Sequence, residues 1–320
     1  MSFLLPGRAS WLAVLPALMI GIAHADSTKP YQPLTSVTGT IKSVGSDTLV
    51  YIMSYWLVEF KRHHKWVVTR IEAAGSSTAP PALLAGKSSF GPMSRKMKDK
   101  EIRAFTDKHG YAPTAVRVAL DGLAVYVHDS NPITGLNLPQ VDAIFSENHR
   151  CGHTQNIDNW GQLGLKTDWG DLPISLFGRN RLSGTRSFFK KKALCKGKFK
   201  TRLGERSTSE LVVKSVSVSR GGIGYSGIGY SGHGARAIAI AKTGSDYIKP
   251  TPANVLSGRY PLSRYLYLYL NKPPGQPLTL LQQEFIRMVF SADGQDTVES
   301  QGFYRLSNDI ITEELRKLGM

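Results

Sequence analysis

The sequence predicts an α/β protein with a largely parallel sheet. Short strand-like runs alternate with segments whose apolar residues recur at helical spacing, and polar turns rich in Gly, Ser and Thr join them. With 320 residues and 41% hydrophobic content, the chain is long enough for one large or two medium domains, and it is too apolar for a disordered tail.

The first half of the chain repeats a unit of strand, polar turn and helix. Apolar alternation marks the strands, and apolar residues three and four apart mark the helices. Pro80 falls where Pro is favoured, in the first turn of a helix. The elements expected here are strands at 40–44 and 67–73, a short apolar step to Met93, a strand at 115–127 interrupted by Asp121-Gly122, and helices at 49–60, from Pro80 to Leu84 and at 98–108.

The second half continues the alternation less regularly. The elements expected are strands at 172–176, 212–218, 235–241 and 265–270, a helix opening at Phe188-Phe189 and an amphipathic helix at 280–290. In parallel sheets ligands bind beyond the carboxyl ends of the strands, which is where the polar turns of this sequence lie.

The N-terminus has the form of a secretory signal peptide over residues 1–25. Arg8 is its single charge, residues 11–23 are mostly apolar, and Ala23-His24-Ala25 is a small-x-small cleavage site. The apolar run is shorter than the roughly 20 residues that a membrane span needs. We therefore expect an exported, periplasmic or extracellular protein, with a flexible lead-in at 26–35.

The chain is strongly basic, with 40 Lys and Arg against 24 Asp and Glu and a formal charge of +16. Because Arg8 is the one charged residue of the signal peptide, the basicity belongs to the mature protein. A basic run at 190–206 holds one acid, Glu205. Such a charge fits nucleic acid, an anionic envelope or a small anion as partner, or a plain solvated face.

Two cysteines, Cys151 and Cys195, would enter an oxidising compartment, where an even number favours a disulfide. A zinc site using His149, Cys151 and His153 is the alternative. No fourth ligand stands at a regular spacing, so the disulfide is the preferred interpretation and no metal is expected.

Four polar turns place hydroxyl residues beside Gly at the junctions of strands and helices. Any one of them is most simply a helix N-cap. Together they could converge as a cage, because helix N-termini offer unpaired N–H donors and small hydroxyl residues allow close approach to an oxyanion. Arg95 and Arg179 could add charged donors. The turns are Gly45-Ser46-Asp47-Thr48, Gly75-Ser76-Ser77-Thr78, Met93-Ser94-Arg95 and Ser183-Gly184-Thr185.

These turns, with Leu120-Asp121-Gly122, Gly224-Tyr225 and Tyr260-Pro261-Leu262-Ser263-Arg264, resemble the periplasmic phosphate-binding proteins of phosphate ABC transporters over residues 38–308. The resemblance implies a two-lobe, type II periplasmic-binding-protein fold with two hinge crossings and a ligand cleft between the lobes. It places one lobe at 36–122 plus 241–320 and the other at 123–240. It also implies a monomer without cofactor that binds inorganic phosphate, passes it to an inner-membrane permease and has no specific nucleic acid partner.

The resemblance assigns phosphate contacts by position. The residues so assigned are Ser46, Thr48, the backbone of Leu49, Ser76, Ser94, Arg95, Arg179, Ser183, Gly184 and Thr185. Many family members carry Asp after the serine equivalent to Ser94, where this chain has Arg95. Asp121 is then the candidate acceptor for the proton of hydrogen phosphate, with a turn-capping Asp as the alternative.

Two enzyme classes receive little support from the sequence. The run from Gly222 to Gly227 matches G-x-G-x-x-G, but an alternating strand follows it where a dinucleotide site needs a helix, so tight turns are the simpler interpretation. A phosphatase-like hydrolase would need a G-x-S-x-G elbow or a metal cluster, and neither is present. A surface protein that binds another oxyanion, extracellular DNA or lipopolysaccharide stays open as an alternative.

Overall fold

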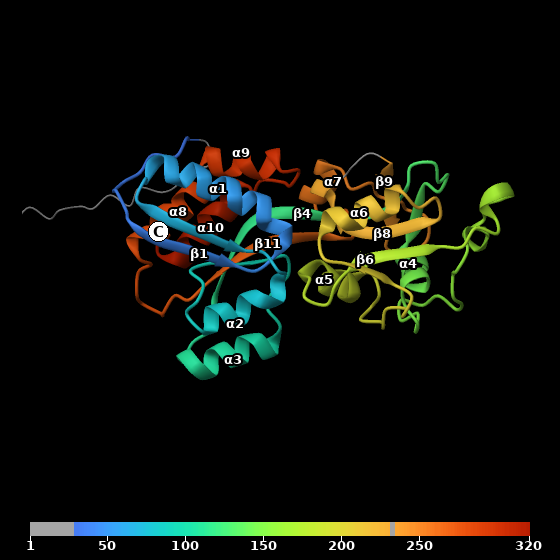
Figure 1. Ribbon diagram of the computed structural model, residues 1–320, viewed down its shortest axis with the longest axis horizontal. Helices are drawn as coiled ribbons and strands as arrows, with labels where there is room; N and C mark the ends of the chain where they lie inside the picture. The colour runs from blue at the N-terminus through green and yellow to red at the C-terminus, as the bar shows by residue number, and fades with distance from the viewer. Residues whose placement is uncertain (1–28, 231–233) are drawn as a thin grey trace, which may run out of the picture.

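The protein has two lobes joined by the long strand β4 (Thr114–His128), which runs from one lobe into the other (Figure 1). The computed structural model describes residues 29–230 and 234–320, and the predicted signal peptide at 1–25 lies outside the described residues. The two ends of the described chain lie together in the first lobe, and the middle of the chain forms the second. The predicted α/β, two-lobe class is confirmed, but the main sheet is mixed, so the expectation of a largely parallel sheet is wrong.

The first lobe holds a mixed sheet covered by helices. Its parallel pair β1–β2 is joined to β3 through a bridge between Ser43 and Phe90, and β11 lies between β3 and β4, antiparallel to both. Its strands are β1 (Gly39–Val44), β2 (Val67–Glu72), β3 (Gly91–Met93), the first half of β4 and β11 (Ser263–Leu270). Its helices are α1 (Val50–His63), α2 (Ala79–Leu84), α3 (Asp99–His109), α8 (Leu280–Val289), α9 (Ala292–Ser300) and α10 (Asn308–Leu318).

The second lobe continues the same sheet beyond β4. Strands β8, β6 and β7 follow β4 in that order, and β5 pairs with β10 in a separate parallel ribbon. Its strands are β5 (Gly135–Asn137), β6 (Ser175–Arg179), β7 (Gly204–Arg206), β8 (Gly222–Gly227), β9 (Ala235–Ala237) and β10 (Ala239–Ala241). Its helices are α4 (Leu138–Phe145), α5 (Gly184–Lys192), α6 (Ser209–Ser217) and α7 (Pro252–Leu256).

Each lobe has its own apolar core, and the two cores show where the chain crosses between lobes. Along β4, Ala119 belongs to the first core and Leu123 to the second. On the return, Tyr260 and Leu262 pack in the second core, and β11 begins at Ser263 in the first-lobe sheet. The chain therefore returns to the first lobe near Ser263, which is 22 residues after the boundary at residue 241 expected from the sequence.

The segment before β1 is docked on the first lobe. The Tyr31 side chain is buried in the first core, its hydroxyl donates to Glu284 Oε2 at 2.6 Å, and its backbone N–H donates to Asp293 Oδ2 at 2.7 Å. Burial and the Glu284 carboxylate raise the pKa of Tyr31. The flexible lead-in expected at 26–35 is thus wrong for the part of it that includes Tyr31.

The segment expected as a strand at 212–218 is helix α6. Thr208 caps the helix by accepting a hydrogen bond from Leu211 N at 3.2 Å, and Val212, Val213 and Val216 bury one helical face. The valine-rich composition favours a strand locally, but packing against the sheet overrides a propensity difference of a fraction of a kcal/mol.

The glycine-rich run expected to form tight turns is instead the buried strand β8, directly under α6. A Cβ on Gly224 would lie 2.8 Å from Val212 Cγ1 and 2.9 Å from Val216 Cγ2. These glycines therefore allow close packing of the helix on the sheet.

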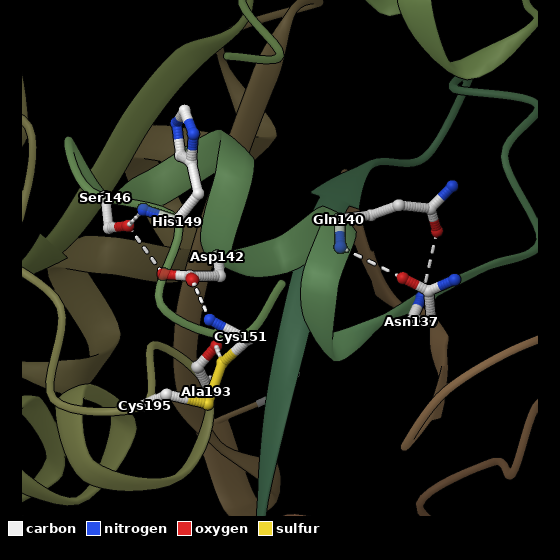
Figure 2. Close-up of a disulfide and its surroundings, with 8 residues drawn as sticks. All are labelled: Asn137, Gln140, Asp142, Ser146, His149, Cys151, Ala193 and Cys195. Atoms are coloured by element: carbon white, nitrogen blue, oxygen red, sulfur yellow. Dashed lines mark hydrogen bonds between the residues drawn. A yellow bond between two sulfur atoms is a disulfide. The ribbon is translucent and has the colours of Figure 1, made fainter. Parts of the chain in front are cut away.

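The predicted disulfide between Cys151 and Cys195 is confirmed (Figure 2). Asp142 of α4 holds the first of these cysteines, since its Oδ2 accepts from Cys151 N at 2.7 Å and its Oδ1 accepts from the Ser146 hydroxyl at 2.5 Å. The sulfur that the zinc alternative requires is bonded to its partner sulfur, so that alternative is wrong. None of the helices in the described residues is both long and apolar enough to cross a membrane.

Candidate functional site

Three helix N-termini meet where the lobes face each other. Ser46 caps the 3-10 turn Asp47–Leu49 that leads into α1, and its Oγ accepts from Thr48 N at 3.2 Å. Ser76 opens the 3-10 turn that leads into α2, and Ser183 caps α5 by accepting from Arg186 N at 3.3 Å. Unpaired N–H groups and the positive ends of the helix dipoles favour an anion at such a meeting point.

We call the five hydroxyl side chains gathered there the hydroxyl cage: Ser46, Thr48, Ser76, Ser94 and Thr185. Ser94 Oγ lies 3.2 Å from both Ser46 Oγ and Ser76 Oγ, and Ser94 N donates to Ser76 Oγ at 3.0 Å. Thr48 Oγ1 lies 3.2 Å from Thr185 Oγ1 of the other lobe. All five side chains are buried, so the fold brings together donors that the sequence separates by up to 139 positions, from 46 to 185.

Gly184 lies at a very close approach between the lobes. A Cβ at this position would lie 2.2 Å from Ser76 Oγ and 2.5 Å from Ser94 Oγ. The neighbouring Leu182 O accepts from Ser77 N at 3.1 Å across the same contact. Glycine therefore lets the N-terminus of α5 reach the hydroxyl cage.

Arg264 connects the hydroxyl cage to Asp121. Its Nε and Nη2 lie 2.8 and 2.6 Å from Asp121 Oδ2, its Nη1 donates to Ser94 O at 2.9 Å, and its Nη2 donates to Thr185 Oγ1 at 3.1 Å. Both charged side chains are buried. Arg264 stands within one of the family-like sequence motifs, but no role for it can be predicted locally, because the alternation that follows it indicates only a strand.

Arg179 also spans the lobes, and its partner Asp47 is not among the contacts predicted from the sequence. Its Nη2 lies 2.7 Å from Asp47 Oδ2, its Nη1 donates to Ser209 Oγ at 2.8 Å, and it is 1% exposed. Tyr230 adds a second contact, since its hydroxyl donates to Thr48 O at 3.0 Å. Burial, with the nearby Asp47 carboxylate, raises the pKa of Tyr230, so this hydroxyl stays a donor.

Arg95 and Leu49 are turned to other partners. Arg95 makes two hydrogen bonds to the Glu101 carboxylate, both 2.7 Å, and a third to Ser77 Oγ at 3.3 Å. Burial opposes ionisation of Glu101, but the hydrogen bonds from Arg95 and from the Lys98 backbone, together with the positive charges of both residues, outweigh it and lower the pKa of Glu101. The Leu49 N–H donates to Ser46 O at 3.3 Å. In the described structure neither residue contacts a cage hydroxyl.

Four buried polar atoms of the residues around the hydroxyl cage have no hydrogen-bond partner among the described residues. They are Asp47 Oδ1, Arg95 Nε, Asp121 Oδ1 and Arg179 Nε. Because buried polar groups in folded proteins are nearly always paired, this concentration marks a place built for a polar ligand.

Residues 32–293 match the PBP superfamily domain. The chain is 48% identical over 301 residues to the "Phosphate-binding protein PstS" of Pseudomonas aeruginosa, which covers 93% of each chain. This chain belongs to the PstS family. The family resemblance stated from the sequence motifs is thereby confirmed.

Solved structures agree with the PstS fold. An ABC-type phosphate transport receptor from Vibrio cholerae aligns with a TM-score of 0.66 at 21% identity, covering 83% of this chain and 100% of the receptor. PstS from Borrelia burgdorferi aligns with a TM-score of 0.55 at 22% identity, covering 84% of this chain and 99% of that one. At these identities the two structures support the fold alone.

The close approach at Gly184 predicts the effect of adding one methyl group. In Gly184→Ala, the new Cβ would clash with Ser76 and Ser94 and hold the lobes apart. Overpacking costs of about 1–3 kcal/mol correspond to a loss of ligand affinity of at least about fivefold. Isothermal calorimetry measures this loss, and thermal unfolding of the ligand-free protein should show no matching destabilisation because Ala favours a helix.

Gly170→Ala is the matched control, because a Cβ there lies 3.4 Å from Thr167 O, an ordinary contact. We expect it to leave the affinity unchanged. Equal affinities of wild type and Gly184→Ala would contradict the closure described here.

Proposed function

We propose that this protein binds inorganic phosphate in the hydroxyl cage and delivers it to the permease of a phosphate ABC transporter. The observation that carries the proposal is the buried hydroxyl cage, assembled from both lobes and closed over three helix N-termini. The 48% identical relative is named a phosphate-binding protein, which supports the same ligand. Export by the signal peptide, a periplasmic location and a monomeric state complete the proposal.

The geometry suits a tetrahedral oxyanion. Such an ion presents oxygens in four directions, and donors reach the cage from α1, α2 and β3 of the first lobe and from α5 of the second. Hydroxyls and N–H groups supply hydrogen bonds without a full countercharge, and burial strengthens each of them. Closure of the lobes also removes water that would compete for the same donors.

Asp121 is our candidate for the selective group. Its Oδ2 is held by Arg264, and its Oδ1 is buried and free to accept in the described structure. Hydrogen phosphate can donate a proton to such a carboxylate, whereas sulfate at neutral pH has none and would place like charges face to face.

Binding without turnover fits the hydroxyl cage. A serine becomes a nucleophile when a base takes its proton. In the described residues the hydrogen bonds of the cage hydroxyls go to one another, to backbone groups and to Arg264, with no histidine or carboxylate base among their partners. The hydroxyls therefore act as donors.

Part of the basic charge is neutralised within the second lobe, which weakens the case for nucleic acid as partner. In the second part of the basic run, Lys198 pairs with Glu147, and Lys200 and Arg202 share Asp158. These cations stabilise their own lobe and leave less charge free for a polyanionic surface.

Titration of ligand-free protein with phosphate, arsenate, sulfate and molybdate tests the proposed function. We expect phosphate to bind tightest, arsenate next as a protonated tetrahedral analogue, and sulfate at least about a hundredfold more weakly, because an unpaired buried polar group costs about 1–3 kcal/mol and charge repulsion adds to it. Calorimetry in a phosphate-free buffer measures all four. Sulfate or molybdate binding as tightly as phosphate would overturn the ligand assignment.

Asp121→Asn separates the acceptor role from a turn-capping role. The amide cannot repel sulfate as a carboxylate does, so phosphate should bind more weakly and the gap between phosphate and sulfate should narrow. Asp246→Asn changes an exposed carboxylate in the same way and serves as the control. Unchanged phosphate and sulfate affinities in Asp121→Asn would show that Asp121 only holds the turn.

A further inference from the structure

A cavity of about 600 Å³ lies between the lobes, next to the hydroxyl cage. We call it the vestibule. The first lobe contributes Lys96 and Lys98, the second contributes Lys191, Lys192 and Lys196, and Arg264 stands in its wall. Because Arg264 also contacts Ser94 and Thr185, the vestibule and the hydroxyl cage share one side chain.

The vestibule has a large uncompensated positive charge. Its two arginines, Arg95 and Arg264, are neutralised by Glu101 and Asp121. The lysine side chains have no ion pair within residues 29–230 and 234–320, and the one acid in the wall is Asp99. The five lysines are Lys96, Lys98, Lys191, Lys192 and Lys196.

The positive charge around the vestibule affects the pKa of one of its lysines, Lys98. Burial first, and then the positive charges of Arg95, Lys100 and Lys190, lower the pKa of Lys98, with Glu101 opposing them. An anion placed among these groups would relieve that repulsion.

A strained turn holds one of the lysines at the vestibule. Cys195 and Lys196 both have left-handed backbone conformations, with φ of 46° and 67°. Such conformations are unfavourable for side-chain-bearing residues and persist where the surroundings enforce them. The disulfide to Cys151 anchors this turn, and the Lys196 N–H donates to Lys190 O at 2.8 Å. These constraints fix the position of Lys196 in the vestibule wall.

We propose that the vestibule binds a condensed phosphate chain of two or more units, bridging the two lobes while the hydroxyl cage holds its own ion. Linked phosphates spread several negative charges over a length that can reach lysines on both sides. A nucleotide fits less well, because the Phe188 ring already faces Arg264 at 5.3 Å and the Tyr265 ring faces Arg117 at 5.2 Å, which occupies faces that a base would stack on.

Bridging by a polyanion would also favour the closed form. Without an anion, closure brings the positively charged lysines of the two lobes together, and they repel each other. A bound phosphate chain would attract the lysines of both lobes and so stabilise the closed form. Release of phosphate from the hydroxyl cage should then be slower in its presence.

Titration of tripolyphosphate into phosphate-saturated protein tests the proposal. The proposal rests on the proposed function in one respect, since it assumes that phosphate fills the hydroxyl cage. We expect wild-type protein to bind tripolyphosphate at one saturable site, with an affinity that falls with added salt. In a triple variant that carries Lys191→Gln, Lys192→Gln and Lys196→Gln, the affinity for tripolyphosphate should be at least about tenfold lower. Stopped-flow release of phosphate should slow when tripolyphosphate is bound. Direct phosphate titration of the same variant reports separately on the cage.

The control variant carries Lys166→Gln, Lys214→Gln and Lys242→Gln, which removes three exposed lysines away from the vestibule lining. It should bind tripolyphosphate as wild type does. The proposal is overturned if saturated wild-type protein does not bind tripolyphosphate, or if both triple variants bind it equally. If ATP binds at least about tenfold more tightly than tripolyphosphate, the ligand is not a condensed phosphate chain, and the site recognises the base. The wild-type titration is decisive even if the vestibule variant folds poorly.

Discussion

The close approach of the α5 N-terminus to the first lobe at Gly184 is the constraint on which the rest of the site depends. With no Cβ, residue 184 lets Thr185 come within 3.2 Å of Thr48 and lets Arg264 reach Thr185. Each half of the site is incomplete without the other, because hydroxyl donors come from both lobes. A ligand held there is enclosed by both lobes, so we expect binding and lobe closure to occur together.

The contact between the lobes also buries charged side chains, and each buried arginine there has a carboxylate partner. Arg264 pairs with Asp121, and Arg179 of the second lobe pairs with Asp47 of the first. A buried ion pair seldom adds net stability, but removing one partner is costly, so such pairs impose a particular arrangement. The free oxygens Asp47 Oδ1 and Asp121 Oδ1 lie beside this arrangement. The surplus of lysine lies outside it, in the vestibule, where solvent and anions can reach.

Much of the fold and the cage could be predicted from local pattern. Ser46, Ser76 and Ser183 stand out because N-caps and strand ends have short-range signals, and β4 is visible as a long apolar strand, although Asp121-Gly122 predicts an interruption that the strand does not have. The features that could not be predicted depend on contacts between residues that are distant in the sequence. The valines of α6 look like a strand until the sheet beneath them is known, Arg264 is separated from Asp121 by 143 positions, and the lobe boundary is set by Tyr260 and Leu262 packing in the second core.

A crystal structure of the protein with bound phosphate tests the central claim most directly. It should place phosphate oxygens about 2.6–3.2 Å from the hydroxyls of Ser46, Thr48, Ser76, Ser94 and Thr185, with Gly184 against the same ion and both lobes closed around it. Phosphate found only among the vestibule lysines, or bound to one lobe with the cage hydroxyls still paired to one another, would contradict the account.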